Sequence, residues 1–215
     1  MKLKVKFTSD EAKEFYKDKD ILVRASEEAA GLDVTAFFNG HETINYNGNQ
    51  KYDSKFSMPL APGDFMKVPT GMAFEPVSDD ELELKPNEVW YVKIVPRSGL
   101  AASKGLSIVN APGVVDCDYR GEVFILLINN GKSEIQINNG DRIAQAIVSK
   151  ATIPQISIVD NITKTERDDG GFGSSGITGK LNIPKSKSNP VIKTEPKLVD
   201  TIKRDDEEVK GEGSE

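Results

Sequence analysis

The chain has 215 residues, of which 37% are hydrophobic, and a formal net charge of −6 at pH 7. This composition is typical of one globular domain with appendages, and the negative charge argues against general nucleic-acid binding, which relies on surplus Lys and Arg. The one Cys and one His exclude an internal disulfide, a zinc site built from Cys and His, and a His-based catalytic triad.

The sequence shows no feature of a membrane or secreted protein. No apolar run reaches the roughly 18 residues of a membrane-spanning helix. The N-terminal segment turns charged before the apolar centre of a signal peptide could form. We therefore expect a cytoplasmic protein with no membrane partner.

Apolar and polar residues alternate along much of the chain, which is the period of β-strands. The first strand is expected over Leu3, Val5 and Phe7, followed by one short helix within 8–20, where Thr8 and Glu11 have the spacing of a capping box. Further strands are expected at 88–96, at 123–128, at 142–148 and around Ile135 and Ile137, with a turn of helix after Gly99.

Turn signals separate these runs at short intervals, at 61–64, 130–133 and 138–141. Many short strands with frequent turns are typical of a sandwich, jelly roll or compact barrel. The sequence therefore predicts an all-β domain.

Two regions differ from this pattern. Residues 41–57 are polar and Asn-rich, which indicates a long loop or an excursion from the barrel. Residues 177–215 contain no aromatic side chain, repeat Pro and end in a charged run, which predicts a disordered tail. The tail is either a solvated appendage or a segment that binds or tethers a partner.

The stretch GVVDCDYRGEV, residues 113–123, is the most unusual part of the expected sheet. Asp116 and Asp118 are two residues apart, so on an extended chain they point to one side, roughly 6.5 Å apart. Asp and Gly also favour turns. From these residues alone, a plain turn and a functional site both remain open.

Four other clusters carry polar groups near strand ends. AAGLDVTA (29–36) is by itself a common strand start, and in PRSGLA (96–101) Arg97 either binds an anion or makes a structural ion pair. In NNGDRIAQAIV (138–148), Asp141 and Arg142 suit a structural polar network, whereas Gln145 could contact a ligand.

The fourth cluster, RDDGGFGSSG (167–176), is rich in Gly. It is either a linker or an arm that places a guanidinium on phosphate and a ring on a base. The chain contains no P-loop pattern, so a Walker-type NTPase is not expected.

In this order the five clusters resemble motifs one to five of the trimeric dUTP diphosphatases. The resemblance covers residues 21 to 176, and Asp-x-Asp-Tyr-Arg-Gly and Gly-Asp-Arg-Ile-Ala-Gln are its most specific parts. The matching stretches are 30–33, 96–99, 113–121, 140–145, and Arg167 together with 170–174.

The resemblance implies a compact jelly roll or distorted barrel of many short strands, homotrimeric, with a flexible C-terminal arm. The implied domains are a barrel at 1–165, an arm at 166–176 and the tail at 177–215. The implied reaction is hydrolysis of dUTP to dUMP and pyrophosphate by in-line attack of water on the α-phosphorus, with Mg²⁺. This reaction limits uracil in DNA and supplies dUMP for thymidylate synthesis. Each site would be shared by three subunits.

The resemblance also implies roles for single residues. Asp116 is the expected general base, Tyr119 lies under the deoxyribose and leaves no space for a 2′-hydroxyl, and Asp33 reaches Mg²⁺ through water. Uracil is read by Asn110 and by backbone groups around Val114, Val115 and Phe124. The phosphates are held by Arg97, Ser98 and Gly99 with Gln145 close by, and the arm closes with Arg167 on the γ-phosphate, Phe172 on the uracil, and Gly173 and Ser174 beside them.

The chain departs from the family pattern in three places. Arg167 is followed by Asp168 and Asp169, where the family has Gly and a variable residue, so extra negative charge would weaken arm closure. The excursion and the tail exceed the compact family form and leave room for a protein partner. The rival interpretations are a dCTP deaminase of the same fold, whose catalytic pattern is absent, and a non-catalytic nucleotide-binding trimer that contacts another protein.

Overall fold

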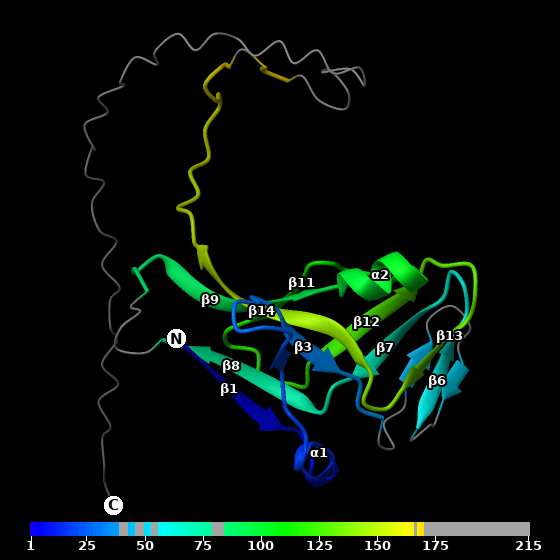
Figure 1. Cartoon of the computed structure of the whole chain (residues 1–215). Coiled ribbons are helices and arrows are strands. Elements are labelled where there is room, and N and C mark those ends of the chain that lie inside the picture. The colour runs from blue at the N-terminus through cyan, green and yellow to red at the C-terminus, as the bar shows by residue number, and fades with distance from the viewer. Residues whose placement is uncertain (39–42, 46–49, 53–55, 79–83, 166, 170–215) are drawn as a thin grey trace, which may run out of the picture. The chain divides into compact units, whose positions relative to one another are not determined.

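The computed structural model describes residues 1–38, 43–45, 50–52, 56–78, 84–165 and 167–169 (Figure 1). The chain divides into two units, Met1–Ile158 and Val159–Glu215. The described residues of the second unit are exposed and contain neither helix nor strand. The first unit ends at Ile158, before the boundary at residue 165 expected from the sequence, and the proposed arm and tail fall almost wholly outside the described residues.

The first unit is built from short strands. In chain order the strands are β1 (Lys2–Phe7), β2 (Val23–Arg24), β3 (Leu32–Thr35), β4 (Thr43–Asn45), β5 (Gln50–Tyr52), β6 (Ser57–Leu60), β7 (Phe65–Pro69), β8 (Met72–Val77), β9 (Glu88–Val95), β10 (Leu106–Ile108), β11 (Gly113–Asp116), β12 (Phe124–Asn129), β13 (Ile135–Asn138) and β14 (Arg142–Thr152). The helices are α1 (Asp10–Tyr16) and α2 (Ser98–Lys104). The expected all-β class is confirmed.

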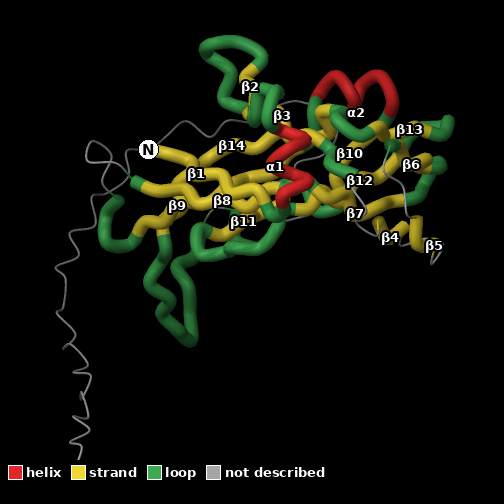
Figure 2. Tube along the Cα trace, turned by 90° about the horizontal axis from the view of Figure 1, so that it is seen from below, coloured by secondary structure: helices red, strands yellow, loops and turns green. Residues whose placement is uncertain are grey.

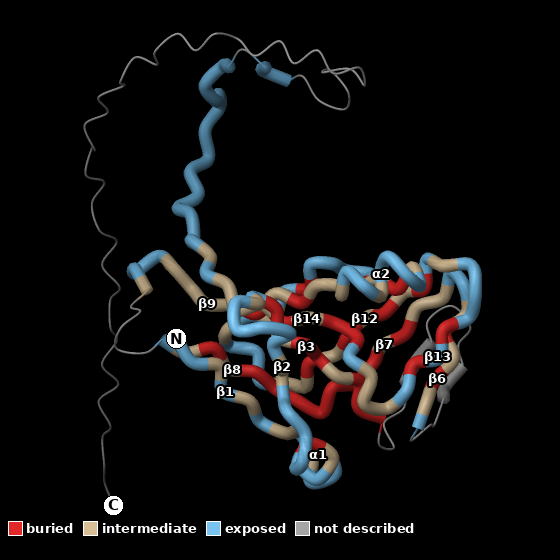
Figure 3. Tube along the Cα trace, in the orientation of Figure 1, coloured by how far each residue is buried: buried red, intermediate tan, exposed pale blue. Residues whose placement is uncertain are grey.

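The strands form two five-stranded sheets, ordered β10-β12-β7-β4-β5 and β11-β9-β14-β3-β2, and two antiparallel pairs, β1-β8 and β13-β6. Figure 2 shows the same strands from a second side, with α1 and α2 as the two helical segments. The buried side chains run along β3, β7, β12 and β14, whereas both helices are largely exposed (Figure 3). The core includes Val34, Phe38, Met58, Leu60, Val68, Phe74, Val92, Ile125, Leu127 and Ala144.

Several expected elements are confirmed because their apolar alternation matches one buried face. In β13, Ile135 and Ile137 are buried while Gln136 and Asn138 are exposed. The expected strands at 88–96, 123–128 and 142–148 appear as β9, β12 and β14, and the helix after Gly99 appears as α2, which begins at Ser98.

One local expectation is wrong. Helix α1 is capped by Ser9, whose Oγ accepts a hydrogen bond from the Ala12 N–H at 3.1 Å, so the capping box does not start at Thr8. In the segment 41–57, for which a long loop or an excursion from the barrel was expected, β4 and β5 pair with each other and extend the sheet beyond β7. In the described part of the chain, neither helix has the length and apolar character needed to cross a membrane.

Candidate active site

The hairpin between β11 and β12 carries the first group of expected site residues. Asp116 ends β11 opposite Tyr91 of β9, and its side chain is exposed. The Tyr119 N–H donates to the Asp116 carbonyl at 3.2 Å and closes a tight turn. A Cβ on Gly121 would lie 2.6 Å from Tyr119 Cζ, so only glycine leaves room for the tyrosine ring in this position.

A cavity of about 280 Å³ opens beside this hairpin. It is lined by Asn110, Val114, Val115, Asp116, Tyr119, Glu122, Val123, Phe124 and Leu126. All six hairpin and base-reading residues expected from the sequence, Asn110, Val114, Val115, Asp116, Tyr119 and Phe124, are therefore brought together. Val114 is 59% exposed and Tyr119 is 45% exposed, so the cavity presents apolar surface that a flat ligand would cover.

The second group surrounds Asp33 of β3, whose side chain is only 2% exposed. Arg97 Nε and Gln145 Nε2 donate to Oδ1 at 3.0 and 3.2 Å, and Arg142 Nη1 donates to Oδ2 at 3.0 Å. The sheet register produces this arrangement, because Gln145 of β14 lies opposite both Asp33 of β3 and Val95 of β9. The structural ion pair considered for Arg97 is present.

The charge of this second group favours an anion. Two guanidinium groups surround one carboxylate, which leaves one net positive charge at the point where β9 ends and α2 begins. Ser98 and Gly99, the first residues of α2, are exposed beside Arg97, and nothing lies within 4 Å of where a Gly99 Cβ would be. Phosphate oxygens could therefore approach Arg97, Ser98 and Gly99.

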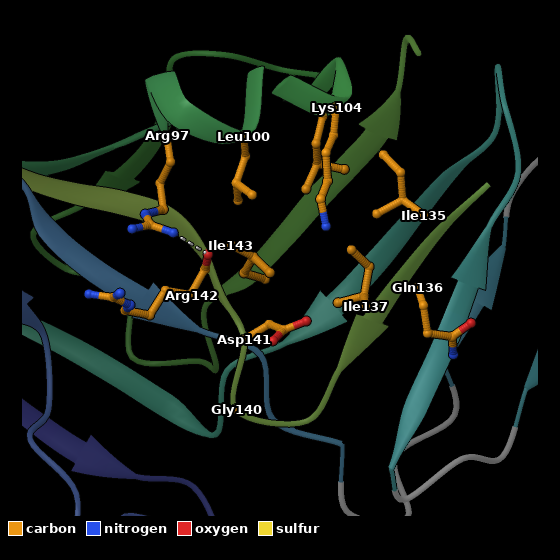
Figure 4. Close-up of a pocket in the computed structure, with 11 residues that line it drawn as sticks. Arg97, Leu100, Lys104, Ile135, Gln136, Ile137, Gly140, Asp141, Arg142 and Ile143 are labelled. Atoms are coloured by element: carbon orange, nitrogen blue, oxygen red, sulfur yellow. Dashed lines mark hydrogen bonds between the residues drawn. The ribbon is translucent and has the colours of Figure 1, made fainter. Parts of the chain in front are cut away.

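A further cavity of about 280 Å³ adjoins this group (Figure 4). Arg97 Nη1 donates to the Arg142 carbonyl at 2.9 Å, and the Lys104 side chain points into the space between Leu100 and Ile135 (Figure 4). Asp141 Oδ2 accepts two hydrogen bonds from Asn138, one from the backbone N–H at 2.8 Å and one from the side-chain Nδ2 at 3.1 Å. Asp141 thus closes the turn before β14, in keeping with the structural role expected for it.

Asp116 and Asp33 are not adjacent within one chain. Asp116 lies opposite Tyr91, and Gln145 lies opposite Val95 of the same strand, about 13 Å further along at 3.3 Å per residue. Three strand spacings of about 4.8 Å separate β11 from β3, so the Cα atoms of Asp116 and Asp33 are about 19 Å apart. One small group bound between Asp116 and Asp33 of the same chain therefore could not contact both carboxylates.

No site that could hold a metal ion with protein ligands alone occurs in the described residues, since no three His, Cys, Asp or Glu side chains come together there. Asp33 receives three hydrogen bonds, and a carboxylate offers about four acceptor positions. Asp33 therefore keeps one acceptor position, on Oδ2, and its expected role of reaching Mg²⁺ through water stays a prediction.

The remaining expected residues belong to the arm. Arg167 is described within the second unit, and the Asp168 N–H donates to Thr165 Oγ1 at 3.0 Å. Phe172, Gly173 and Ser174 lie outside the described residues. Their expected roles stay predictions.

Sequence reasoning did not single out Glu122, which also lines the hairpin cavity. Its Oε1 accepts the N–H groups of Thr70 at 3.1 Å and Gly71 at 2.7 Å. A carboxylate directly before an apolar strand was the available signal, because such a residue needs hydrogen-bond partners once it is partly buried.

The fold and these two groups define a β-protein with a cavity of about 280 Å³ beside the Asp116 carboxylate and a separate group with one net positive charge. The family model described as dUTPase matches residues 82–176. The deoxyuridine 5′-triphosphate nucleotidohydrolase of Caldanaerobacter subterraneus subsp. tengcongensis is 38% identical over 175 residues, 81% of this chain and 97% of the relative. The protein of the same name from Neorickettsia sennetsu is 40% identical over 162 residues, 74% of this chain and 90% of the relative.

Solved structures agree on the fold. The dUTPase of Staphylococcus bacteriophage 80alpha with dUPNHPP has a TM-score of 0.57 at 20% identity, and covers 82% of this chain and 99% of its own. A variant of the dUTPase from phage phi11 of S. aureus, solved with a structural Mg(II) ion, has a TM-score of 0.53 at 17% identity. The match covers 76% of this chain and 100% of the phage chain. The chain described here belongs to the dUTPase family and has its jelly-roll fold.

Proposed function

We propose that the chain is a dUTP diphosphatase that hydrolyses dUTP to dUMP and pyrophosphate. The observation that carries this proposal is that the six expected residues of segment 110–124 line one cavity of about 280 Å³, with the exposed Asp116 among them. Membership of the dUTPase family supports the same reaction.

Asp116 is the general base in this proposal. It holds the attacking water by hydrogen bonds and takes its proton as the oxygen bonds to the α-phosphorus and pyrophosphate leaves. Asp116 ends β11, is exposed and lines the cavity, so its carboxylate is accessible to a water bound there. A positioned general base contributes typically about 10²–10⁴-fold to a rate.

The cavity selects the nucleoside. Asn110 and the backbone of Val114, Val115 and Phe124 read the uracil edge, because strand N–H and C=O groups at the cavity wall present fixed donors and acceptors. A base with the opposite hydrogen-bond polarity, such as cytosine, would leave those groups unpaired. The Tyr119 ring, held by the close approach of Gly121, lies under the deoxyribose.

The group around Asp33 receives the triphosphate. Arg97, Ser98 and Gly99 bind phosphate oxygens, and Gln145, already bonded to Asp33, lies beside them. Mg²⁺ would neutralise and orient the phosphate chain when bound. Among the residues of this chain, Asp33 would hold the ion's hydration shell through its remaining acceptor position.

The separation of about 19 Å between the Cα atoms of Asp116 and Asp33 supports a homotrimer in which one subunit supplies the hairpin and another the phosphate-binding group. The arm, with Arg167, Phe172, Gly173 and Ser174, would close over the substrate as a lid. We place the reaction in the cytoplasm, where the deoxynucleotide substrate is found.

The test is pyrophosphate release from dUTP, dCTP, dTTP and UTP, each with and without Mg²⁺, on the full-length protein. Release confined to dUTP and dependent on Mg²⁺ is expected. Binding of dUTP without release would support the non-catalytic trimer instead, and turnover of dCTP would support the deaminase interpretation. No observation in the described residues favours either of these rivals.

A further inference from the structure

The corner between β7 and β8 is a rigid part of the barrel. Thr70 is fully buried, and its carbonyl accepts the Tyr16 hydroxyl at 2.8 Å. Gly71 has a φ of +68°, and a Cβ there would lie 2.8 Å from the Phe37 ring and 2.9 Å from Ala12. The corner is therefore packed against α1 on one side, and its backbone has little freedom to move.

Glu122 fastens the catalytic hairpin to this corner. Its Oε1 accepts two successive backbone N–H groups, those of Thr70 and Gly71, at 3.1 and 2.7 Å. Thr70 Oγ1 donates to the Val123 carbonyl at 2.7 Å, and the Val123 N–H donates to the Met72 carbonyl at 2.8 Å. Hydrogen bonds from backbone N–H groups to a charged carboxylate are among the stronger ones in proteins.

The same residue also holds Tyr119. The Tyr119 hydroxyl donates to the backbone carbonyl of Glu122 at 3.0 Å, and both residues line the cavity beside Asp116. Glu122 therefore connects the rigid corner, through its carboxylate, to the aromatic wall of the cavity, through its carbonyl. Any shift of Glu122 would move the point to which the tyrosine ring is bonded.

Burial, and next the negative charge of Glu122, raise the pKa of the Tyr16 phenol. Tyr16 therefore keeps its proton and remains a donor to Thr70 across the working pH range. The hydrogen bond from Tyr16 to Thr70 in the corner is therefore kept while the hairpin binds its ligand.

We propose that Glu122 is a positioning residue that sets the sugar specificity of the enzyme, by holding Tyr119 at a fixed depth in the cavity. The inference rests on the proposed function. A steric wall excludes a 2′-hydroxyl only if the wall cannot retreat, because a displacement of about 1 Å already changes reaction rates strongly. Loss of the carboxylate removes two of the four hydrogen bonds that fasten the hairpin to the corner, leaving those of Val123, and this looser attachment gives the ring space to retreat.

The experiment compares kcat/KM for dUTP and for UTP on the full-length trimer. Glu122→Leu removes both acceptors and should lower the dUTP-over-UTP preference by about tenfold or more. Glu122→Gln keeps an oxygen at Oε1 and should retain most of the preference. Glu88→Leu is the matched control, because Glu88 also accepts a backbone N–H, that of Lys85 at 3.0 Å, but is not among the cavity residues.

A ratio of two kcat/KM values from one preparation does not depend on the fraction of folded enzyme, so partial unfolding would not imitate the effect. If Glu122→Leu cannot be obtained folded, Tyr119→Phe, which removes only the hydroxyl bonded to Glu122, should lower the same ratio. If the folded Glu122→Leu protein, or Tyr119→Phe in its place, has an unchanged ratio of kcat/KM for dUTP over UTP, the inference is overturned. Absence of dUTP turnover in the unaltered protein would instead overturn the proposed function.

Discussion

At the scale of single residues, Asp118 is a matched control for Asp116, because both are carboxylates of the same hairpin. Only Asp116 lines the cavity that contains Tyr119. Asp116→Asn keeps the shape but removes the base, so we expect kcat to fall by about 10²–10⁴-fold with dUTP binding retained. Asp118→Asn should leave kcat nearly unchanged. Single-turnover hydrolysis and equilibrium binding of dUTP measure the two effects separately.

Equal losses in Asp116→Asn and Asp118→Asn would contradict a specific role of Asp116, since they would indicate a general effect of hairpin charge. Full turnover by the Asp116→Asn variant would show that Asp116 is not the general base.

Asp33→Asn tests the buried carboxylate. The amide nitrogen of Asn cannot accept a hydrogen bond and would face a donor of Arg97, Arg142 or Gln145. We expect a loss of about 1–3 kcal/mol in the free energy of unfolding, reduced because Arg142 is half exposed. Urea titration of both proteins measures it, and an unchanged midpoint would show that the three donors are satisfied by water.

The sequence showed which residue types are present near the site, but not which side chains bond to one another. Arg97 could be read as an anion ligand or an ion-pair partner, and the structure shows the ion pair with Asp33. Gln145 was expected to need a partner, yet its partner lies 112 positions away and becomes evident only from the register of β14 on β3. Glu122 was missed for the same reason, because its bonds to Thr70 and Gly71 span 52 and 51 positions of the sequence.

At the scale of elements, alternation found the strands with one buried face, such as β1 and β13. It failed for β4 and β5, which are three residues each and lie in an Asn-rich segment without apolar alternation. Such strands form because β7 offers a sheet edge, which is tertiary information. The cap at Ser9 was missed because Thr8 and Ser9 are chemically equivalent candidates one residue apart.

Glu75 of β8 joins three elements, because it bonds Lys4 of β1 at 3.1 Å and Arg120 of the hairpin loop at 3.1 Å. The hydrogen bond from Lys4, followed by the charges of Lys4 and Arg120, lowers the pKa of the Glu75 carboxyl. A lowered folded-state pKa stabilises the fold above the unfolded-state pKa, and this contribution is lost as the pH falls through the folded-state pKa.

We therefore expect wild-type protein to have a higher Tm than Glu75→Gln at about pH 7, with the difference disappearing toward about pH 3. The effect should be small, because the pair is exposed to solvent and salt. Differential scanning calorimetry at both pH values measures it. A difference that grows toward low pH would contradict the assignment.

At the scale of the whole molecule, two truncations separate the arm from the tail. Ending the chain before Glu166 removes Arg167 and Phe172 and should lower kcat for dUTP strongly while the proposed trimer still forms. Removing residues 180–215 should leave kcat nearly unchanged, because the composition of this segment is that of a solvated appendage. Light scattering gives the mass, and an equal loss in both truncations would mean that the tail takes part in catalysis.

The separation of Asp116 from Asp33 makes the shared site testable by complementation. If a hairpin works with the phosphate-binding group of another subunit, Asp116→Asn and Ser98→Ala chains are each nearly inactive alone but complement each other when co-expressed. In random trimers each site combines the two intact groups with a probability of about one half times one half, so activity should recover to about one quarter of the wild-type value. If both groups of a site came from the same chain, every site would carry one substitution, and the mixture would be as inactive as its parents.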